Sequence, residues 1–399
     1  MPFTILFTVG GNLATINTTA LGYMYYTGWY EIWNDNYEMR KYATNVYGNY
    51  TNALTSHYPG DSRSNTLVIN RDNAVTANRM LDGQMWLTAI PDNSFNNVVE
   101  AKLMFRENKL LPKMPENSFA NVVEAERMFH YCYKLQDIPS SNKFDKLTGA
   151  NDMFGACTSL TSIPADSFNN VIDGRAMFAN CSSLSSVPSN MFNTVISADG
   201  MFGQCSALSA IPLNCFNNVE TVSHMFRDCI ALSSIPSNMF NKAINANNMF
   251  ENCVNITELG DNTLTAIENG NKTFYRNDRL SSIGNNTFDN VISATEMFRG
   301  CNALKILNDN SFNNVISANG MFENCGNLSA IPENSFNNVE KVDNMFFNCY
   351  NITSNAIDFI TSHPNITSHK GCFYRCTAMS DYAQATAQYR DWFELGPLF

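Results

Sequence analysis

The sequence predicts a repeat solenoid, that is, a stack of short coils joined by tight corners. A Met-Phe pair recurs at intervals of 24 residues, with one interval of 25, and a leucine, an asparagine pair and a cysteine recur with the same period. A period of this length is typical of units that bury their core only by stacking on their neighbours. The first residue of the pair is Met104, Met128, Met153, Met177, Met201, Met225, Met249, Thr273, Met297, Met321 and Met345.

The pattern within one repeat predicts the path of each coil. Apolar residues fall about every third position, which matches neither a long helix nor a two-faced strand. Asn tolerates left-handed backbone, so the Asn-Asn pair after the phenylalanine predicts a corner. A proline after the isoleucine or valine ends a short strand, because it cannot donate a ladder hydrogen bond. In one repeat the inward positions are Leu184, Val187, Phe192, Val195, Ala198, Met201, Phe202 and Cys205.

The repeat divides the chain into three predicted parts, of which residues 80–378 form the solenoid with coils of about 24 residues and short parallel strands. Residues 1–79 lack the repeat and are rich in tyrosine and tryptophan. Short apolar runs at 3–9 and 66–70 predict a small, mainly β domain there. Residues 379–399 predict a helix with Ser380 as its N-cap and Gly396 as a stop signal. That helix would cap the last coil, which otherwise exposes an apolar end.

Most of the cysteines occupy a single repeat position, and Asn108 and Asn277 take that position in two other repeats. No repeat has two ligands at CxxC spacing, so the pattern does not indicate a metal site. We expect a ladder of buried, reduced thiols. A few disulfides between coils are an alternative, because stacked strands lie about 4.8 Å apart. The ten ladder cysteines are Cys132, Cys157, Cys181, Cys205, Cys229, Cys253, Cys301, Cys325, Cys349 and Cys376.

Composition excludes several classes of protein. Of the 399 residues, 44% are hydrophobic, which excludes a disordered chain. A net charge of −11 has the wrong sign for binding nucleic acid or an anionic membrane. No apolar stretch approaches the roughly 20 residues that span a bilayer.

The motifs of catalysis are also missing. The five histidines are scattered, and the sequence contains no GxSxG elbow, P-loop, HExxH or dinucleotide-binding loop. Carboxylates one repeat apart are spatial neighbours and can form a glycosidase-like pair, but no spacing singles one out. We therefore expect a non-enzymatic protein without cofactor or metal.

The stretch 201–226 has the pattern MFxxCxxLxxIPxxxFNNVxx(A/V)xxMF. This pattern resembles the BspA-like leucine-rich repeats of bacterial surface proteins, mycoplasma-type lipoproteins and some bacteriophage proteins. The resemblance implies a leucine-rich-type solenoid that binds proteins, host matrix or cell-surface glycans and has no catalytic activity. It does not name a ligand.

Two functions fit the sequence. The first is a bacteriophage virion component, a fibre or decoration protein whose aromatic residues Tyr25, Trp29 and Trp33 dock to other virion proteins. The chain begins MPFTILFTVGGN, without an export signal, and has no cysteine before Cys132 to carry a lipid anchor. These features favour the virion. The alternative is a bacterial cell-surface or extracellular adhesin, and a homo-oligomer is compatible with either.

Candidate binding residues are the two between the repeat phenylalanine and the cysteine, because they change from coil to coil. Such positions suit recognition of a host-surface protein or glycan. They also suit ordinary solvated surface, since a solenoid must be polar somewhere, and the aromatic residues of 1–79 equally suit the core of a small β domain. The candidates are Arg106, Glu107, His130, Tyr131, Arg227, Asp228, Glu323 and Asn324.

Overall fold

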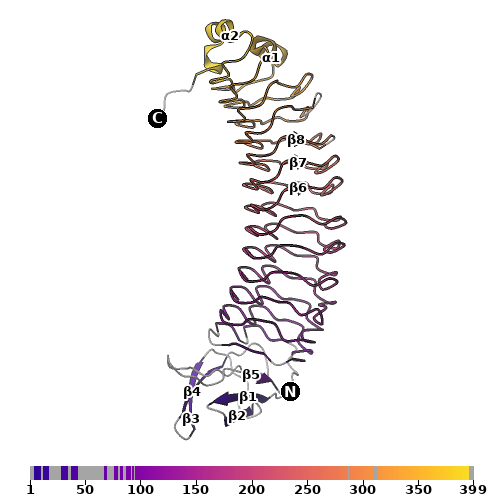
Figure 1. Cartoon of the computed structure of the whole chain (residues 1–399), viewed down its shortest axis with the longest axis vertical. Coiled ribbons are helices and arrows are strands. Elements are labelled where there is room, and N and C mark those ends of the chain that lie inside the picture. Colours follow the sequence, from indigo (N-terminus) through magenta and orange to yellow (C-terminus); the bar gives the residue numbers. More distant parts are fainter. Residues whose placement is uncertain are drawn as a thin grey trace. The chain divides into compact units, whose positions relative to one another are not determined.

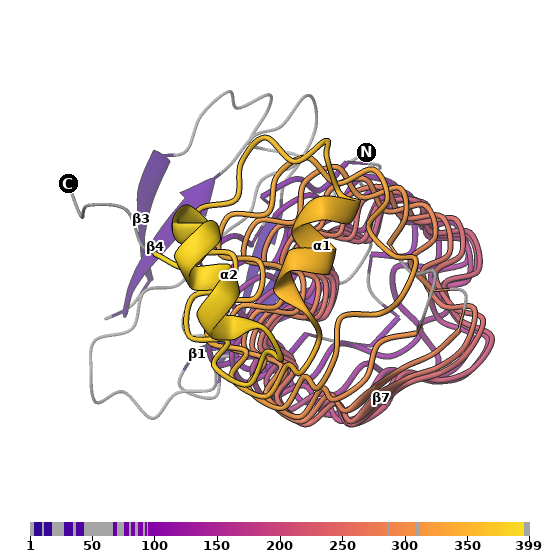
Figure 2. The ribbon, with the colours of Figure 1, turned by 90° about the horizontal axis from the view of Figure 1, so that it is seen from above.

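The computed structural model describes residues 4–9, 12–17, 28–34, 37–43, 67–69, 76–79, 81–83, 87–90, 92–93, 95–285, 287–308 and 312–394. The chain forms two compact units, Met1–Val195 and Ile196–Phe399. Both contain stacked coils (Figure 1), and the coils repeat nearly the same outline when seen along their stacking direction (Figure 2).

The first unit begins with antiparallel strands. The strand β1 (Thr4–Val9) lies between β2 (Asn12–Asn17) and β5 (Leu67–Ile69) in a three-stranded sheet. The strands β3 (Gly28–Asn34) and β4 (Tyr37–Ala43) form a separate hairpin. β1 and β5 lie within the two apolar runs that the sequence predicts as strands.

The coils of the first unit are joined by backbone hydrogen bonds. The N–H of Phe105 donates to the carbonyl of Met128, and that of Phe129 donates to Met153, both at 2.8 Å. Parallel bridges connect Glu100 to Glu124 and Glu124 to Gly149. Each coil therefore satisfies the backbone groups of its neighbour, as strands in a parallel sheet do.

The second unit repeats this arrangement and adds a short parallel sheet. Its strands are β6 (Ser234–Ile235), β7 (Glu258–Leu259) and β8 (Ser282–Ile283), in the order β6-β7-β8. β6 ends directly before Pro236, as the predicted role of the proline requires. A second column of parallel bridges, one per coil, runs from Ser197 through Thr221 to Lys341 and Ser368.

Phenylalanines from two repeat positions form the core. Phe226 stacks on Phe250 with ring centroids 5.5 Å apart and planes 2° from parallel. It meets Phe240 edge-on at 6.1 Å and 64°. All three side chains are buried. Aromatic pairs in these two geometries contribute about 0.5–1.5 kcal/mol each beyond burial, so the phenylalanine columns bind each coil to the next.

The left-handed backbone lies elsewhere than the sequence suggests. Neither residue of the Asn-Asn pair has positive φ in the part of the chain that the structure describes. Instead the preceding phenylalanine does, as at Phe216 (φ 62°), and so does the asparagine two positions earlier, as at Asn214 (φ 58°). The predicted corner is confirmed, because Asn217 and Asn218 lie in a turn, but the left-handed residues are their neighbours. The second asparagine of the pair bridges coils: Asn314 Nδ2 donates to the carbonyl of Asp289 at 2.7 Å.

The last coil contains a helix that the repeat does not predict. Met345 and Cys372 are 27 positions apart, three more than the usual 24. The extra length forms α1 (Ala356–Ser362), whose N-cap side chain, Asn355, accepts from Asp358 N at 2.9 Å.

The C-terminal helix is shorter than the sequence predicts. α2 covers Tyr382–Gln388 and is followed by a 3-10 helix, Arg390–Trp392. Its N-cap is Asp381, so the prediction of Ser380 is wrong. The Asp381 carboxylate accepts from the N–H groups of Ala356 and Ile357 at 2.8 Å each and so connects the start of α2 to α1.

The residues after α2 continue the backbone ladder. Phe373 N donates to the carbonyl of Trp392 at 2.8 Å, as Phe346 N donates to Cys372 one coil earlier at 2.9 Å. Trp392 and Phe393 are buried.

Candidate binding surface

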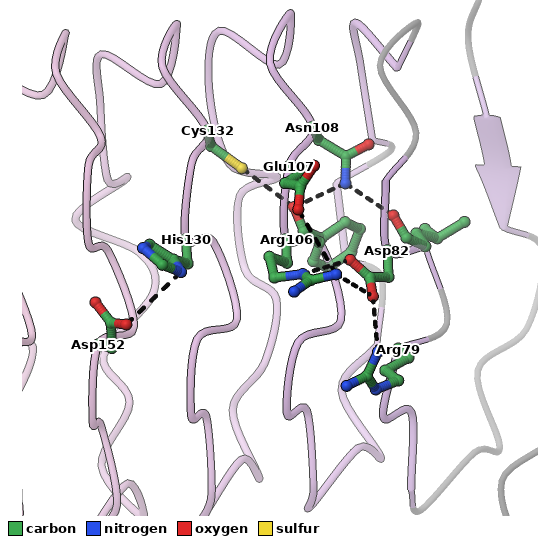
Figure 3. Close-up of polar contacts among 10 residues, drawn as sticks. Arg79, Asp82, Arg106, Glu107, Asn108, His130, Cys132 and Asp152 are labelled. Carbon is green, nitrogen blue, oxygen red and sulfur yellow. Dashed lines mark hydrogen bonds and ion pairs between the residues drawn. The ribbon is translucent and has the colours of Figure 1, made fainter.

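Two of the predicted pairs lie side by side in the first unit. Arg106 and Glu107 precede Asn108 in one coil, and His130 and Tyr131 precede Cys132 in the next. The N–H of Glu107 donates to the carbonyl of His130 at 2.8 Å, which holds the two pairs at the same level. Figure 3 shows Arg106, Glu107 and His130 on these coils.

Arg106 forms a two-point contact with the preceding coil. Its Nε lies 2.8 Å from Asp82 Oδ1, and its Nη2 lies 3.2 Å from Asp82 Oδ2. The hydrogen bond to Asp82 raises the pKa of Arg106, although burial opposes it. Because the guanidinium is also 3.6 Å from Glu107 Oε1, its charge is largely balanced within the protein.

His130 faces a carboxylate of the following coil. Its Nδ1 lies 3.6 Å from Asp152 Oδ2, which is also 3.0 Å from Arg127 Nε. Burial lowers the pKa of His130, and the nearby Asp152 only partly opposes this. Burial likewise raises the pKa of Asp152. The lowered pKa favours the neutral form of the imidazole. An aromatic ring from the next residue stacks on this imidazole.

That ring is Tyr131, whose centroid lies 3.8 Å from that of His130 at an angle of 21°. Tyr133 lies 5.8 Å from Tyr131, and Lys109 Nζ lies 5.9 Å from the centre of the Tyr133 ring. Tyr131 is 38% exposed, Tyr133 37% and Leu110 50%. We call Leu110, Tyr131 and Tyr133, with the adjoining Lys109 and His130, the Tyr131 surface.

The sequence pattern finds only part of this surface. It singles out His130 and Tyr131 but misses Leu110, Tyr133 and Lys109, which lie between the ladder position and the next repeat leucine. These positions also change from coil to coil, and that variability was the available signal.

The pairs predicted in the second unit are engaged in contacts between coils. Arg227 Nε lies 3.4 Å from Asp228 Oδ2 and 3.3 Å from Glu251 Oε2. Arg299 Nη2 lies 2.9 Å from Glu323 Oε1. Burial raises the pKa of Glu323, while the Arg299 charge opposes this. Such partly exposed ion pairs contribute little net stability.

Asn324 takes part in a similar contact, because its Oδ1 accepts from Asn348 Nδ2 at 2.8 Å. Glu323 and Asn324 lie four coils beyond Arg227 and Asp228 along this unit. The structure therefore does not bring the two pairs together.

The predicted docking residues cannot be placed in the same way. Tyr25 lies outside the described residues. Trp29 and Trp33 belong to β3, where they pair with Tyr42 and Glu38 of β4, and the structure describes only their backbone.

The cysteine ladder is a structural feature of the coils. All twelve cysteines lie among the described residues, and each is a buried thiol outside any disulfide. Burial raises the pKa of the ladder thiols, to about 12 for Cys229 and Cys376. Such thiols are poor nucleophiles and poor metal ligands, because both roles require the thiolate.

Within the described residues, no three His, Cys, Asp or Glu side chains are arranged to hold a metal ion. No helix in this part of the chain is long and apolar enough to span a membrane.

Comparison with known proteins identifies the repeats. The family model described as "BspA type Leucine rich repeat region (6 copies)" matches residues 125–257. The model described as "Mycoplasma protein of unknown function, DUF285" matches residues 268–385. A search of the curated proteins found no match.

One solved structure is similar to the chain. It is a leucine-rich repeat protein from Bacteroides ovatus ATCC 8483, with 17% sequence identity and a TM-score of 0.39, and the match covers 85% of this chain and 97% of that one. The two family models and the repeat pattern agree with the stacked coils described above. The chain therefore contains BspA-type leucine-rich repeats over residues 125–257.

Proposed function

We propose that the protein is a non-enzymatic binding protein of a bacterial cell surface or of the extracellular medium, and that its Tyr131 surface contacts a protein partner. BspA-type repeats are typical of bacterial surface and secreted proteins, and this supports the location. The bacteriophage virion favoured by the sequence finds no support in the comparisons.

The observation that carries the proposal is the exposure of Leu110, Tyr131 and Tyr133 together on neighbouring coils. Tyrosine is enriched among residues that contribute most to protein interfaces, because it offers a large, rigid and amphipathic face. The stack on His130 restricts the Tyr131 ring before binding, which lowers the entropy lost on association.

The charges near these rings indicate the partner. Lys109 of the preceding coil lies near the Tyr133 ring, and Lys134 directly follows Tyr133. Neither lysine forms an ion pair in the described part of the chain. A partner with an apolar pocket rimmed by carboxylates would match this surface. Complementary charge of this kind increases the association rate and the specificity more than the affinity.

A binding experiment tests the surface. The purified chain is applied to immobilised extracellular-matrix and serum proteins, and any protein bound is measured again with a Tyr131→Ala/Tyr133→Ala double variant. We expect at least a tenfold weaker Kd, because interface tyrosines typically cost about 2 kcal/mol or more when truncated. The control is Tyr350→Ala, an exposed tyrosine at the repeat position of Tyr133 in the second unit. Equal binding by the double variant and the wild type would refute the role of this surface.

Location is tested separately, by fractionating source cells and particles. Recovery of the chain at a bacterial surface or in the medium supports the proposal, whereas recovery in assembled virions would restore the first hypothesis.

We also infer that residues after Met379 cap the coil stack. Support comes from the burial of Trp392 and Phe393 and from the hydrogen bond that Phe373 N donates to Trp392. Terminal coils require such a cover.

A further inference from the structure

The second unit contains a cleft between α1 and the coil before it. The cleft has a volume of about 830 Å³ and is lined by residues from the segments 306–307, 329–337 and 354–363. This volume lies within the range of about 300–1,000 Å³ that is typical of small-molecule sites. Figure 1 shows α1 beside the last coils of this unit.

The cleft lies where α1 departs from the path of a regular coil. Ile331, which lines it, is partly exposed, as is the equivalent Ile283 of another coil, whereas Ile211, Ile235 and Leu259 are only 2–4% exposed. The Ile331 N–H donates to the hydroxyl of Ser354 at 2.9 Å. Ile331 therefore gives the cleft an apolar surface.

Both ends of α1 are held in place. Asp381 binds the first two N–H groups of the helix at 2.8 Å each. At the other end, His363 Nε2 lies 3.0 Å from the carbonyl oxygen of Ser335 across the cleft, and its Nδ1 lies 2.7 Å from that of Phe359. The cleft is thus formed before any ligand arrives, which limits the entropy cost of binding.

The lining is rich in groups that bind hydroxyls. It carries the hydroxyls of Ser329 and Ser354, the amides of Asn334 and Asn337, and the carboxylate of Asp358. Amides both donate and accept hydrogen bonds, and a carboxylate accepts two at once.

Charge narrows the ligand class further. The carboxylates of Asp358 and Glu333 line the cleft, and none of the lining residues is Lys or Arg. An anionic ligand would be repelled, in a chain whose net charge is already −11. The lining also offers apolar surface, because Ile306 is 71% exposed and Ile331 is partly exposed, so the ligand that fits best carries hydroxyls and one less polar face.

We propose that this cleft binds a neutral saccharide unit, whose hydroxyls bond to the serine, asparagine and Asp358 side chains while its less polar face rests on Ile331. The cleft goes beyond the proposed function of the Tyr131 surface, since it lies in the other unit and takes a different class of ligand.

The test uses the full chain and saturation-transfer NMR with glucose, galactose, mannose, N-acetylglucosamine and N-acetylgalactosamine. Glucuronic acid and N-acetylneuraminic acid serve as anionic comparisons. We expect at least one neutral sugar to bind with a Kd on the order of 1 mM or tighter, and the anionic sugars not to bind.

Two variants locate the binding. Ala330→Trp fills the cleft from an exposed lining position and should abolish binding. Ala210→Trp, at the same repeat position in a coil remote in sequence from the cleft, is also exposed and should leave binding unchanged. Asp358→Asn should weaken the Kd about tenfold, because it replaces a charged acceptor by a neutral one.

Each outcome decides the proposal. It is overturned if no neutral sugar binds, if binding survives Ala330→Trp, or if anionic sugars bind equally well. Circular dichroism and thermal melting confirm that the variants are folded. Since neither tryptophan alters Tyr131 or Tyr133, this result and that for the Tyr131 surface are independent.

Discussion

The Sγ of Cys253 lies 3.0 Å from the carbonyl oxygen of Phe226, one coil earlier, and donates its hydrogen to it. Cys301 makes the same contact with Phe274 at 3.2 Å. In the first unit Asn108 Nδ2 performs this task, donating to the carbonyls of Leu81 and Phe105 at 2.8 and 2.7 Å. The ladder position therefore suits a small side chain with at least one hydrogen-bond donor, which both cysteine and asparagine provide.

Asn277 fills this position poorly. It is fully buried, and among the described residues neither its Nδ2 nor its Oδ1 has a hydrogen-bond partner. Unsatisfied buried polar groups cost about 1–3 kcal/mol each. We expect Asn277→Cys to raise the free energy of unfolding by about 1–2 kcal/mol, measured as a higher Tm. Asn108→Cys should change Tm little, because the loss of the two hydrogen bonds from Nδ2 is offset by removal of the buried Oδ1, which has no partner among the described residues. A lower Tm for Asn277→Cys would contradict this account of the ladder.

The ladder thiols should be unreactive in the native protein. Burial raises the pKa of Cys229 to about 12, so at about pH 8 only about one thiol in ten thousand is ionised. We expect Ellman's reagent to label none of the twelve cysteines rapidly in buffer and all of them in denaturant. Rapid labelling of several thiols in the native protein would show that coils open easily, and missing thiols in denaturant would reveal disulfides.

The phenylalanine columns should dominate stability. Phe226→Ala removes a fully enclosed ring from contacts with Phe240 and Phe250, and such truncations cost about 3–5 kcal/mol. The control is Ile244→Ala, at a position 49% exposed in the same unit, which should cost less than about 1 kcal/mol. Thermal melting followed by circular dichroism compares the two. Similar losses in both variants would mean that the core lies elsewhere.

His130 should make stability depend on pH. Burial lowers its pKa in the folded state, so as the pH falls below about 6.5 the unfolded chain binds the proton first and stability is lost. Asp152 has the opposite effect on the pH dependence of stability. Burial raises its pKa in the folded state, so the ionised carboxylate costs stability and protonation at lower pH restores it.

We therefore expect the wild-type Tm to fall more than that of His130→Gln between about pH 7.5 and about pH 5.5. Differential scanning calorimetry of both proteins across this range measures the difference. If the Tm of the two proteins changes with pH in the same way, protonation of His130 does not destabilise the folded state.

Several features follow from the sequence alone. The 24-residue period predicts the stacked coils, the inward phenylalanines and the buried cysteine ladder, and the proline predicts the end of β6 at Ile235. These features are readable because each coil stacks on a near copy of itself, so the same position must satisfy the same environment in every repeat.

The tertiary structure decided what differs between coils. The Tyr131 surface depends on Lys109 and Tyr133 lying near each other across two coils, which no single repeat specifies. The contact between α2 and α1 depends on Asp381 reaching the N–H groups of α1, twenty-five residues earlier in the case of Ala356. The cleft beside α1 depends on where three extra residues leave the coil path. The period determines the contacts that every coil shares, whereas these sites arise from side-chain contacts between particular coils, and those contacts leave no periodic trace in the sequence.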